Sequence, residues 1–345
     1  MPHQAIVFTN EKNLKDFSLQ KVAVAFEMHK DLIGTPAAIW EVEIHPSNSC
    51  NLKCKGCAYG TRHNHHQLSP KQVLEIINHY SQYDLKSVFF SGGGEPLLWT
   101  GWDFLLDHLE KSCHYGIATN MVGFYSIESF SYIFDFYQIH VIGIDDHSFY
   151  AATGTNYFSL CDKNIRRLAL KKAPSQNIAL KLLVSVENVH LLPLYLDYSS
   201  TIDNVDSIII KFQQDFIRDH NCSTAGAIDA IRKVVYNHAM RNKYNFLIDN
   251  LDDIIKNQLP PPSKCVFSDS GLYKLINASG ECYPCIAGNA VGYNAQNEHD
   301  FYDRAMNEGR CPKSACRHYR FSQFLSNRCS SKYSSNLEEY VPILL

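Results

Sequence analysis

The sequence has no long apolar run and no large excess of charge of one sign. No stretch approaches the roughly 18 apolar residues of a membrane span, and the segment from Met1 to Phe17 is polar, without the apolar centre of a secretory signal. The formal net charge is only −3, which argues against a general nucleic-acid binder. We therefore expect a cytoplasmic protein with neither a membrane nor a nucleic acid as partner.

Cysteine, in contrast, is abundant, with 12 residues in a chain of 345. Because the cytoplasm keeps thiols reduced, we do not expect disulfides. Cys50, Cys54 and Cys57 form one tight group near the amino terminus. A second group occupies the last third of the chain: Cys265, Cys282, Cys285, Cys311, Cys316 and Cys329. Closely spaced thiolates are typical ligands of iron–sulfur clusters and of zinc.

The middle of the chain alternates short apolar runs with helical patterns. Strands are predicted over residues 39–44, 87–90, 116–119, 141–144, 178–184 and 207–212. Helices are predicted over residues 69–80, 102–110, 126–136, 163–172 and 191–199. This order favours an α/β fold with parallel strands and right-handed crossovers, a partial (β/α)6 TIM-like barrel.

The strands also alternate in polarity. Glu41, Glu43 and His45 share one face of the first strand, while Val42 and Ile44 share the other. The outer face of a barrel strand meets helices and should be apolar, so we expect the polar face to line an interior that holds ligands. An exposed edge strand is the alternative explanation of this pattern.

Four regions are expected from these patterns. They are an N-terminal extension over 1–37, the barrel over 38–216, a helical linker over 217–262 and a small cysteine-rich domain over 263–345. The last region has too little periodic apolar sequence for a large core, so we expect a metal centre to cross-link it.

Two motifs follow the first two predicted strands. Cys50, Cys54 and Cys57 have the spacing Cys-x3-Cys-x2-Cys, and Gly92, Gly93, Gly94 and Glu95 follow the second strand. In this order the chain resembles the radical S-adenosylmethionine (SAM) superfamily. The resemblance implies a [4Fe–4S] cluster on the three cysteines, with one iron left for SAM. It also implies that the glycine run and Glu95 hold the amino group of SAM.

The resemblance implies further contacts to SAM. Many members have an aromatic residue before the third cysteine, where this chain has Gly56. Either Tyr59 is the substitute against adenine, or adenine is held mainly by backbone groups. By analogy Asn120, Asp145 and Ser185 would also contact SAM, and capping or turn roles are the alternative for each. Histidines at 63, 65 and 66 lie close to the cysteines, which leaves zinc open.

The spacing from Cys265 through Gly280 to Cys285 resembles the start of a SPASM or twitch domain. This implies one auxiliary [4Fe–4S] cluster on four of the six C-terminal cysteines. A second, incompletely ligated cluster and a structural zinc site are the alternatives.

The implied function is reductive cleavage of SAM to a 5′-deoxyadenosyl radical, which abstracts hydrogen from a peptide or a small natural product. An electron donor such as flavodoxin or ferredoxin would be a partner. Cys222 is the candidate catalytic hydrogen donor of an epimerisation, with a spare thiol as the alternative. Lys211, Gln213 and Asp215 alternate along the sixth strand and are candidates for holding substrate. Cys113 and Cys161 are expected to be packing residues.

Two other functions are left open. One is an oxidative maturase that dehydrogenates or cross-links its substrate, with the auxiliary cluster accepting the electron. The other is a non-catalytic zinc or iron–sulfur scaffold or sensor, in which Glu95 would be only a turn residue.

Overall fold

The computed structural model describes part of the chain. The described residues are 39–57, 59, 64–83, 85–124, 128–212, 230, 233–234, 237, 245–249 and 273–283. The predicted N-terminal extension over 1–37 lies outside them, as do most of 217–262 and most of 263–345. None of the described helices is long and apolar enough to cross a membrane.

The described strands form one sheet in the order β7-β6-β5-β4-β3-β2-β1-β8-β9. Their bounds are β1 Glu41–Ile44, β2 Ser87–Phe90, β3 His114–Thr119, β4 Phe136–Val141, β5 Asn177–Val184, β6 Ser207–Phe212, β7 Asn245–Asp249, β8 Tyr273–Ile276 and β9 Cys282–Tyr283. Every neighbouring pair from β7 to β8 is parallel, and β9 pairs antiparallel with β8. The predicted α/β class with a parallel sheet is therefore confirmed.

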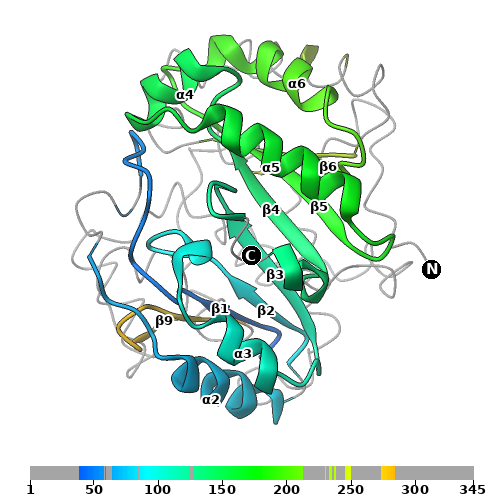
Figure 1. Ribbon diagram of the computed structural model, residues 1–345. Coiled ribbons are helices and arrows are strands. Elements are labelled where there is room, and N and C mark those ends of the chain that lie inside the picture. The colour runs from blue at the N-terminus through cyan, green and yellow to red at the C-terminus, as the bar shows by residue number, and fades with distance from the viewer. Residues whose placement is uncertain are drawn as a thin grey trace, which may run out of the picture.

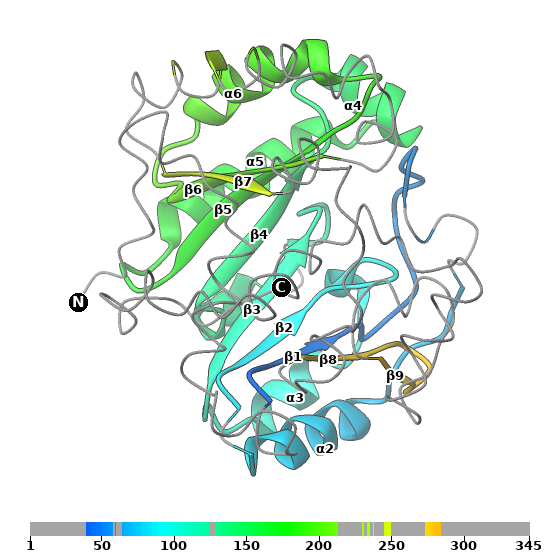
Figure 2. The ribbon, with the colours of Figure 1, turned by 180° about the vertical axis from the view of Figure 1, so that it is seen from behind.

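Helices connect successive strands and cover one face of the sheet (Figures 1 and 2). The α-helices are α2 Pro70–Ser81, α3 Trp102–His108, α4 Asp146–Thr153, α5 Phe158–Lys171 and α6 Leu192–Ser200. The 3-10 helices are η4 Pro96–Leu98, η6 Glu128–Ile133 and η7 Val189–Leu191. Helix α2 begins at Ser69, whose hydroxyl accepts from the Gln72 backbone N–H in a capping box.

The two faces of the strands differ as the sequence pattern predicts. Val42 and Ile44 of β1 are buried in the main apolar core, on the face that the helices cover. Glu41, Glu43 and His45 are buried on the opposite face, where Ser87 Oγ donates to Glu41 at 3.0 Å. The polar residues of β1 thus line the interior and do not lie on an exposed edge.

Two predicted elements near the middle of the chain are wrong. The fourth strand covers Phe136–Val141 and not residues 141–144, because Asp145 instead caps helix α4 by accepting from the Ser148 N–H. The helix predicted over 126–136 is the shorter 3-10 helix η6, followed directly by β4.

The predicted linker over 217–262 is also not wholly helical. Asn245–Asp249 forms β7, which pairs in parallel with β6. Short apolar runs fit a strand and a buried helix equally well, so local pattern did not separate the two.

Strands β8 and β9 come from the region predicted to be a separate C-terminal domain. β8 pairs in parallel with β1, with Glu41 opposite Tyr273 and Glu43 opposite Leu275. The barrel sheet is therefore larger than the six strands predicted, and its first strand is flanked by β2 on one side and by β8 on the other.

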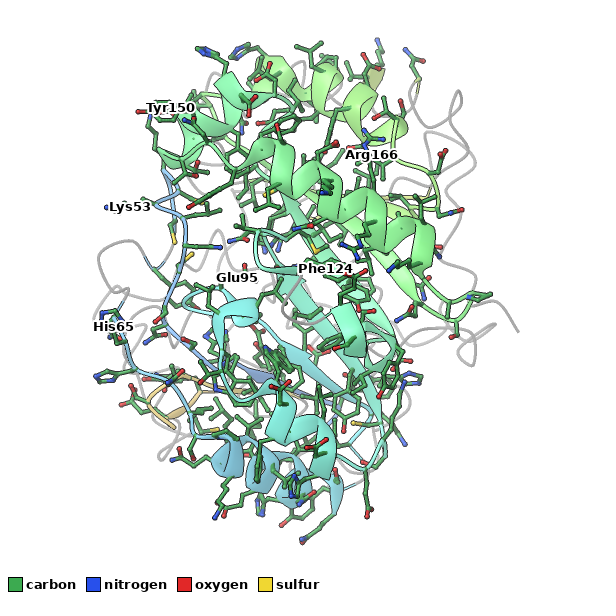
Figure 3. All side chains as sticks on the ribbon, in the orientation of Figure 1. Lys53, His65, Glu95, Phe124, Tyr150 and Arg166 are labelled. Carbon is green, nitrogen blue, oxygen red and sulfur yellow. The ribbon has the colours of Figure 1, made fainter. Side chains whose placement is uncertain are left out.

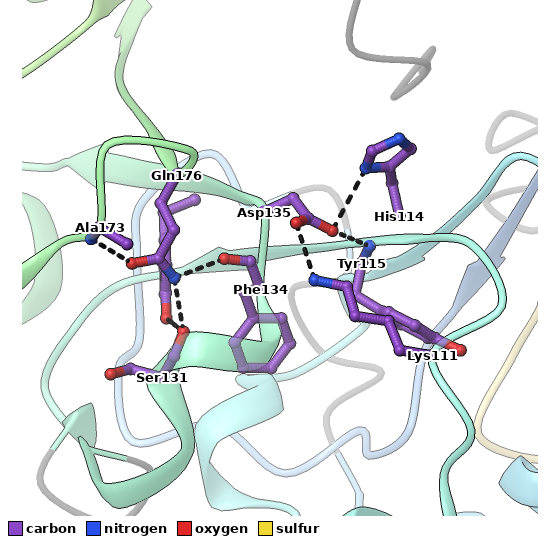
Figure 4. A network of polar contacts seen from close by, with 9 residues as sticks. Lys111, His114, Tyr115, Ser131, Phe134, Asp135, Ala173 and Gln176 are labelled. Carbon is purple, nitrogen blue, oxygen red and sulfur yellow. Dashed lines mark hydrogen bonds and ion pairs between the residues drawn. The ribbon is translucent and has the colours of Figure 1, made fainter. Parts of the chain in front are cut away.

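A polar network fixes the amino ends of β3, β4 and β5 (Figure 4). The Asp135 carboxylate accepts from Lys111 Nζ at 2.8 Å and from the Tyr115 backbone N–H at 3.1 Å. Gln176 Nε2 donates to the carbonyl oxygens of Phe134 and Ser131 at 2.6 and 2.8 Å. This end of the sheet lies opposite the loops that carry the predicted site residues.

Candidate active site

The loop after β1 carries Cys50, Cys54 and Cys57, all half-buried and outside any disulfide. Leu52, in the middle of the loop, is buried in an apolar cluster that Cys50 and Cys54 pack against. The Lys55 backbone N–H donates to the Ala152 carbonyl at the end of α4, at 2.8 Å. The loop is therefore held at a fixed place above the sheet.

The three thiols lie close enough together for the charge of one to influence the pKa of another. Burial is the largest cause that raises the pKa of Cys50 to about 11 and of Cys54 to about 12. The charge of Cys57 raises both further, as does that of Glu95. Without a cation these groups stay neutral, and a bound metal would favour the thiolates.

The donor set fits an iron–sulfur cluster, because three thiols come from one loop and cysteine thiolate is the usual ligand of iron–sulfur clusters. Within the described part of the chain, no three cysteine, histidine or carboxylate side chains converge on the position of a single metal ion. A four-iron cluster requires no such convergence, since each thiolate binds a different iron.

The glycine run after β2 packs directly on the segment that precedes Cys50. The N–H of Gly94 donates to the Ser47 carbonyl at 3.2 Å, and that of Glu95 donates to the Ser49 carbonyl at 2.8 Å. A β-carbon on Gly94 would lie 2.1 Å from the Ser49 oxygen, and one on Gly93 would lie 2.4 Å from Asn48 Oδ1. These glycines thus allow two loops to approach each other.

Gly92 is also restricted, because a β-carbon there would lie 2.6 Å from the Gly94 carbonyl oxygen. Sequence reasoning gave these glycines the task of approaching a ligand. The structure adds a second reason for a glycine at each of these three positions. A β-carbon there would lie too close to atoms of the same loop or of the neighbouring loop.

Glu95 is buried, with 3% of its surface exposed. Its Oε1 accepts from the Leu97 N–H at 3.1 Å and from Thr119 Oγ1 at 2.6 Å. Its Oε2 accepts from the Asn120 N–H at 2.8 Å. Burial raises the pKa of Glu95 to about 7 although these three donors oppose the shift. Since a carboxylate accepts about four hydrogen bonds, these three leave one acceptor position on Oε2.

Asn120 joins the end of β3 to the cysteine loop. Its Nδ2 donates to Asn51 Oδ1 at 2.8 Å, and its Oδ1 accepts from the Val122 N–H at 2.9 Å. The next residue, Met121, has φ 64, which is uncommon for a residue other than glycine. Asn164 Nδ2 donates to the Met121 carbonyl at 2.8 Å and holds this turn.

Tyr59 lies beside the glycine run. Its ring meets His45 edge-on with centroids 5.7 Å apart, and its Cδ1 would be 3.4 Å from a β-carbon on Gly93. Gly56 has φ 72, so an aromatic residue at this position would be strained.

The other two predicted SAM contacts lie further along the same end of the sheet. Asp145 is exposed, and its Oδ1 accepts from the Ser148 N–H at 2.7 Å, which gives it a capping role. Ser185 is buried just after β5, and its N–H donates to Asn188 Oδ1 at 2.8 Å.

The remaining candidates are divided between described and undescribed residues. Lys211 is half-buried on β6. Cys282 packs toward α2, with its sulfur 4.0 Å from the Tyr80 hydroxyl. Cys161 is buried and Cys113 packs against the core. The other candidates lie outside the described residues: Gln213, Asp215, Cys222, Cys265, Cys285, Cys311, Cys316 and Cys329.

Sequence reasoning missed several residues that support the site. Asn51 and Thr119 bond to Asn120 and Glu95, although neither belongs to a motif that signals this role. Figure 3 shows Glu95 near the centre of the molecule, between the lower elements and the upper helices. Lys53 lies at the outer edge of the molecule in the same view.

The sequence pointed to only some members of a buried polar cluster that is centred on Glu43. Glu43 accepts from His45 Nε2 at 2.9 Å and also contacts the hydroxyls of Ser91 and Tyr273. The alternation along β1 pointed to Glu43 and His45, but nothing local pointed to Tyr273.

Comparisons with known proteins agree with this geometry. Residues 44–171 match the family model of the radical SAM superfamily. SuiB of Streptococcus suis bound to the precursor peptide SuiA matches with a TM-score of 0.60 and 15% identity over 92% of this chain and 79% of that chain. Native anSMEcpe with bound AdoMet matches with a TM-score of 0.51 and 14% identity over 80% of this chain and 84% of that chain.

No curated protein matches the sequence significantly. The two structural likenesses, at such low identity, show a shared fold. The family match over residues 44–171, with the cysteine and glycine loops that lie within that range, shows that this part of the chain is a radical SAM domain, the kind of domain that holds a [4Fe–4S] cluster and SAM.

Proposed function

We propose that this enzyme uses Cys50, Cys54 and Cys57 to bind the [4Fe–4S] cluster and acts on a peptide. The observation that carries the assignment is the packing of the Gly92–Gly94 run on the segment before Cys50, with Glu95 close enough to raise the pKa of Cys50. A SAM molecule on the cluster would therefore lie beside Glu95. When bound, the cluster and SAM supply a 5′-deoxyadenosyl radical that removes a hydrogen atom from the substrate.

The chain's own groups hold and shield the reactants. The remaining acceptor position on Glu95 Oε2 suits an N–H of the methionyl amino group, and the Thr119 and Asn120 donors keep the carboxylate oriented. Leu52, Val122 and Phe149 form an apolar wall beside Cys50 and Cys54. This wall would limit access of water to a reactive intermediate.

A peptide is the substrate that the structural likeness favours. SuiB, the neighbour with a TM-score of 0.60, was solved with a precursor peptide. A polar barrel interior on β1 is compatible with a bound peptide, whose amide groups require hydrogen-bond partners.

Within this class we propose epimerisation, with Cys222 returning a hydrogen atom to the substrate radical. Oxidative maturation is the second candidate, and an auxiliary [4Fe–4S] cluster on four of the C-terminal cysteines would then accept an electron. Of those six cysteines only Cys282 lies among the described residues. Hydrogen donation would leave a thiyl radical on Cys222, which one electron and one proton would return to the thiol. That electron, and the one that cleaves SAM in either reaction, would come from a reductant of the flavodoxin or ferredoxin type.

The first experiment is anaerobic reconstitution, followed by iron and sulfide analysis and by assay of 5′-deoxyadenosine release from SAM with dithionite. Cys54→Ala should abolish release, because it removes one of three thiolate ligands. Cys113→Ala is the matched control, since Cys113 packs against the core away from the loop. Zinc without sulfide, or release that survives in Cys54→Ala, would contradict the assignment.

The reaction type is decided by substrate mass. Epimerisation leaves the peptide mass unchanged and introduces one deuteron in deuterated water, whereas oxidation removes two hydrogens. Cys222→Ala should retain 5′-deoxyadenosine release yet give no epimerised product. Normal product from this variant would exclude Cys222 as the donor.

A further inference from the structure

The turn after β3 has a strained backbone. Met121, with φ 64, adopts the left-handed conformation that residues other than glycine rarely adopt. Its side chain is fully buried in the apolar core, so a glycine here would relieve the strain but lose this packing. Backbone strain of this kind persists only where the surrounding structure fixes it, and it is concentrated at functional sites. The neighbours of the turn must therefore hold it in place.

The turn determines where two donors to the Glu95 carboxylate lie. Thr119 Oγ1 donates to Oε1 at 2.6 Å, and the Asn120 N–H donates to Oε2 at 2.8 Å. The Met121 N–H donates to the same Thr119 hydroxyl oxygen at 2.9 Å. The strained residue and the two donors thus form one bonded unit. A change in the Met121 backbone angles would move these donors relative to the carboxylate.

Two side chains of helix α5, which we call the α5 clamp, bond to this turn. Asn164 Nδ2 donates to the Met121 carbonyl at 2.8 Å and to the Val122 carbonyl at 3.4 Å. Cys161 Sγ donates to the Asn120 carbonyl at 3.3 Å. Both clamp side chains are buried, with 5% of their surface exposed, and residues three apart lie on the same side of a helix. Three consecutive carbonyl groups of the turn are therefore bonded to one face of α5.

We propose that the two members of the α5 clamp, Asn164 and Cys161, are positioning residues for SAM. They act through Glu95 and not by contact with SAM, because they fix the turn that orients its carboxylate. The inference rests on the proposed function, since it takes the remaining acceptor position on Glu95 Oε2 as the partner of the methionyl amino group. A hydrogen bond depends on the direction of its acceptor, so loss of the clamp should weaken SAM binding.

The test is anaerobic calorimetry of SAM binding to the reconstituted holoenzyme, with the cluster oxidised so that SAM is not cleaved. Asn164→Leu keeps about the same side-chain size and removes the donor. We expect it to weaken SAM at least about tenfold, which corresponds to one hydrogen bond to a charged group. Affinity is expressed per intact cluster, from the iron and sulfide content, so that loss of cluster is not counted as loss of SAM binding.

Gln176→Met is the matched control. Gln176 is also 5% exposed, and its Nε2 also donates to two backbone carbonyls, those of Phe134 and Ser131. It belongs to the network at the amino ends of the strands (Figure 4). Both variants remove a buried donor and should lower the thermal stability, but only Asn164→Leu should weaken SAM. Equal weakening of SAM in the two variants would show a general structural effect and overturn the proposal.

A milder pair of variants at Cys161 tests the clamp without removing its main donor. Cys161→Ser keeps a donor and should bind SAM within about threefold of the wild type. Cys161→Ala removes the donor and should bind SAM more weakly than Cys161→Ser, by less than Asn164→Leu, because a thiol is a weak donor. If Asn164→Leu does not fold, equal SAM affinity in the two Cys161 variants overturns the proposal.

The wild-type enzyme separates this proposal from the proposed function. If the wild type neither binds SAM nor releases 5′-deoxyadenosine on reduction, the proposed function is wrong and this inference with it. If the wild type does both and Asn164→Leu binds SAM as tightly, only the positioning role is wrong.

Discussion

Glu95 illustrates how a buried carboxylate can organise two loops at once. It accepts from the backbone of its own loop at Leu97 and from the end of β3 at Thr119 and Asn120. Donors reach both of its oxygens, so a replacement with a single acceptor oxygen would leave one of these donors without a partner. The cost of burying the charge is visible in the pKa of about 7.

Glu95→Gln should therefore destabilise the fold although the side chain keeps its size. The amide has a single acceptor oxygen, and its NH₂ group would face either the Asn120 N–H or the Leu97 N–H. We expect a loss of about 1–3 kcal/mol in the free energy of unfolding, the cost of one unsatisfied buried donor. Urea denaturation of the wild type and the variant measures this, and an unchanged midpoint would contradict the described bonding.

Glu43 predicts a dependence of stability on acid. Burial alone would raise its pKa, but the hydrogen bond and charge of His45, with the Ser91 and Tyr273 hydroxyls, lower it from 4.5 to about 2. A lowered pKa in the folded state means that the ionised group stabilises the fold above pH 4.5, and that this contribution is lost as the pH falls toward 2. At about 1.4 kcal/mol per pKa unit the contribution is about 3 kcal/mol.

Thermal unfolding from pH 6 to pH 2 tests this expectation for Glu43. The wild type should lose stability faster than Glu43→Gln over this range, because the variant has no carboxylate to protonate there. Parallel curves for the two proteins would show that Glu43 is not held in its ionised form.

At the level of single residues the sequence points to candidate ligands more readily than to the contacts that support them. Spacing and order single out Cys50, Cys54, Cys57 and the Gly92–Glu95 segment as candidates. Asn51 and Thr119 were not found, because an asparagine or threonine that bonds across a fold has no local pattern.

At the level of elements the two loops after β1 and β2 act as one unit. Gly94→Ala would place a β-carbon 2.1 Å from a backbone oxygen of Ser49, so one loop must move. We expect a cost of about 1–3 kcal/mol and a clear fall in bound iron after reconstitution, measured as iron per protein.

Gly123→Ala is the matched control for this change. Its nearest neighbour would be Leu97 Cβ at 3.2 Å, which is a side-chain atom away from the cysteine loop. This variant should keep the iron content of the wild type. Equal iron in the two variants would show that contact between the loops does not matter for cluster binding.

Element prediction succeeded where caps and periodicity agree. Helix α2 has Ser69, Pro70 and Gln72 at its start, and the structure places it within one residue of the predicted bounds at each end. It failed around β4, because residues 141–144 are as apolar as the true strand. Only the pairing of Phe136–Val141 with β3 and β5 separates the two.

At the scale of the whole molecule, β8 joins a late part of the chain to the first strand. The Tyr273 hydroxyl contacts Glu43 across a sequence separation of 230 residues. Tyr273→Phe should cost about 1–3 kcal/mol in the free energy of unfolding, because it leaves a buried carboxylate with fewer donors. Tyr283→Phe is the control, since that hydroxyl donates to the exposed Glu281 at 2.8 Å. Similar losses in the two variants would argue against a structural role for the contact.

The whole sheet could not have been predicted from the sequence. The order β1 to β6 follows from alternating strands and helices, and the structure agrees with it. The addition of β7, β8 and β9 depends on pairings between distant segments, which no local pattern encodes. The polar face of β1 was the one long-range feature that could be inferred, because every strand of a barrel turns one of its two faces toward the barrel interior.

The late partner of β1 has a consequence for synthesis on the ribosome. Strand β1 emerges early, but its neighbour β8 emerges about 230 residues later, which takes roughly 10–50 s at ordinary elongation rates. During that interval Glu43 lacks its tyrosine, and one edge of the nascent sheet has open backbone groups that invite aggregation. Until translation has passed Ile276, the growing polypeptide therefore exposes the edge of β1 that β8 later covers.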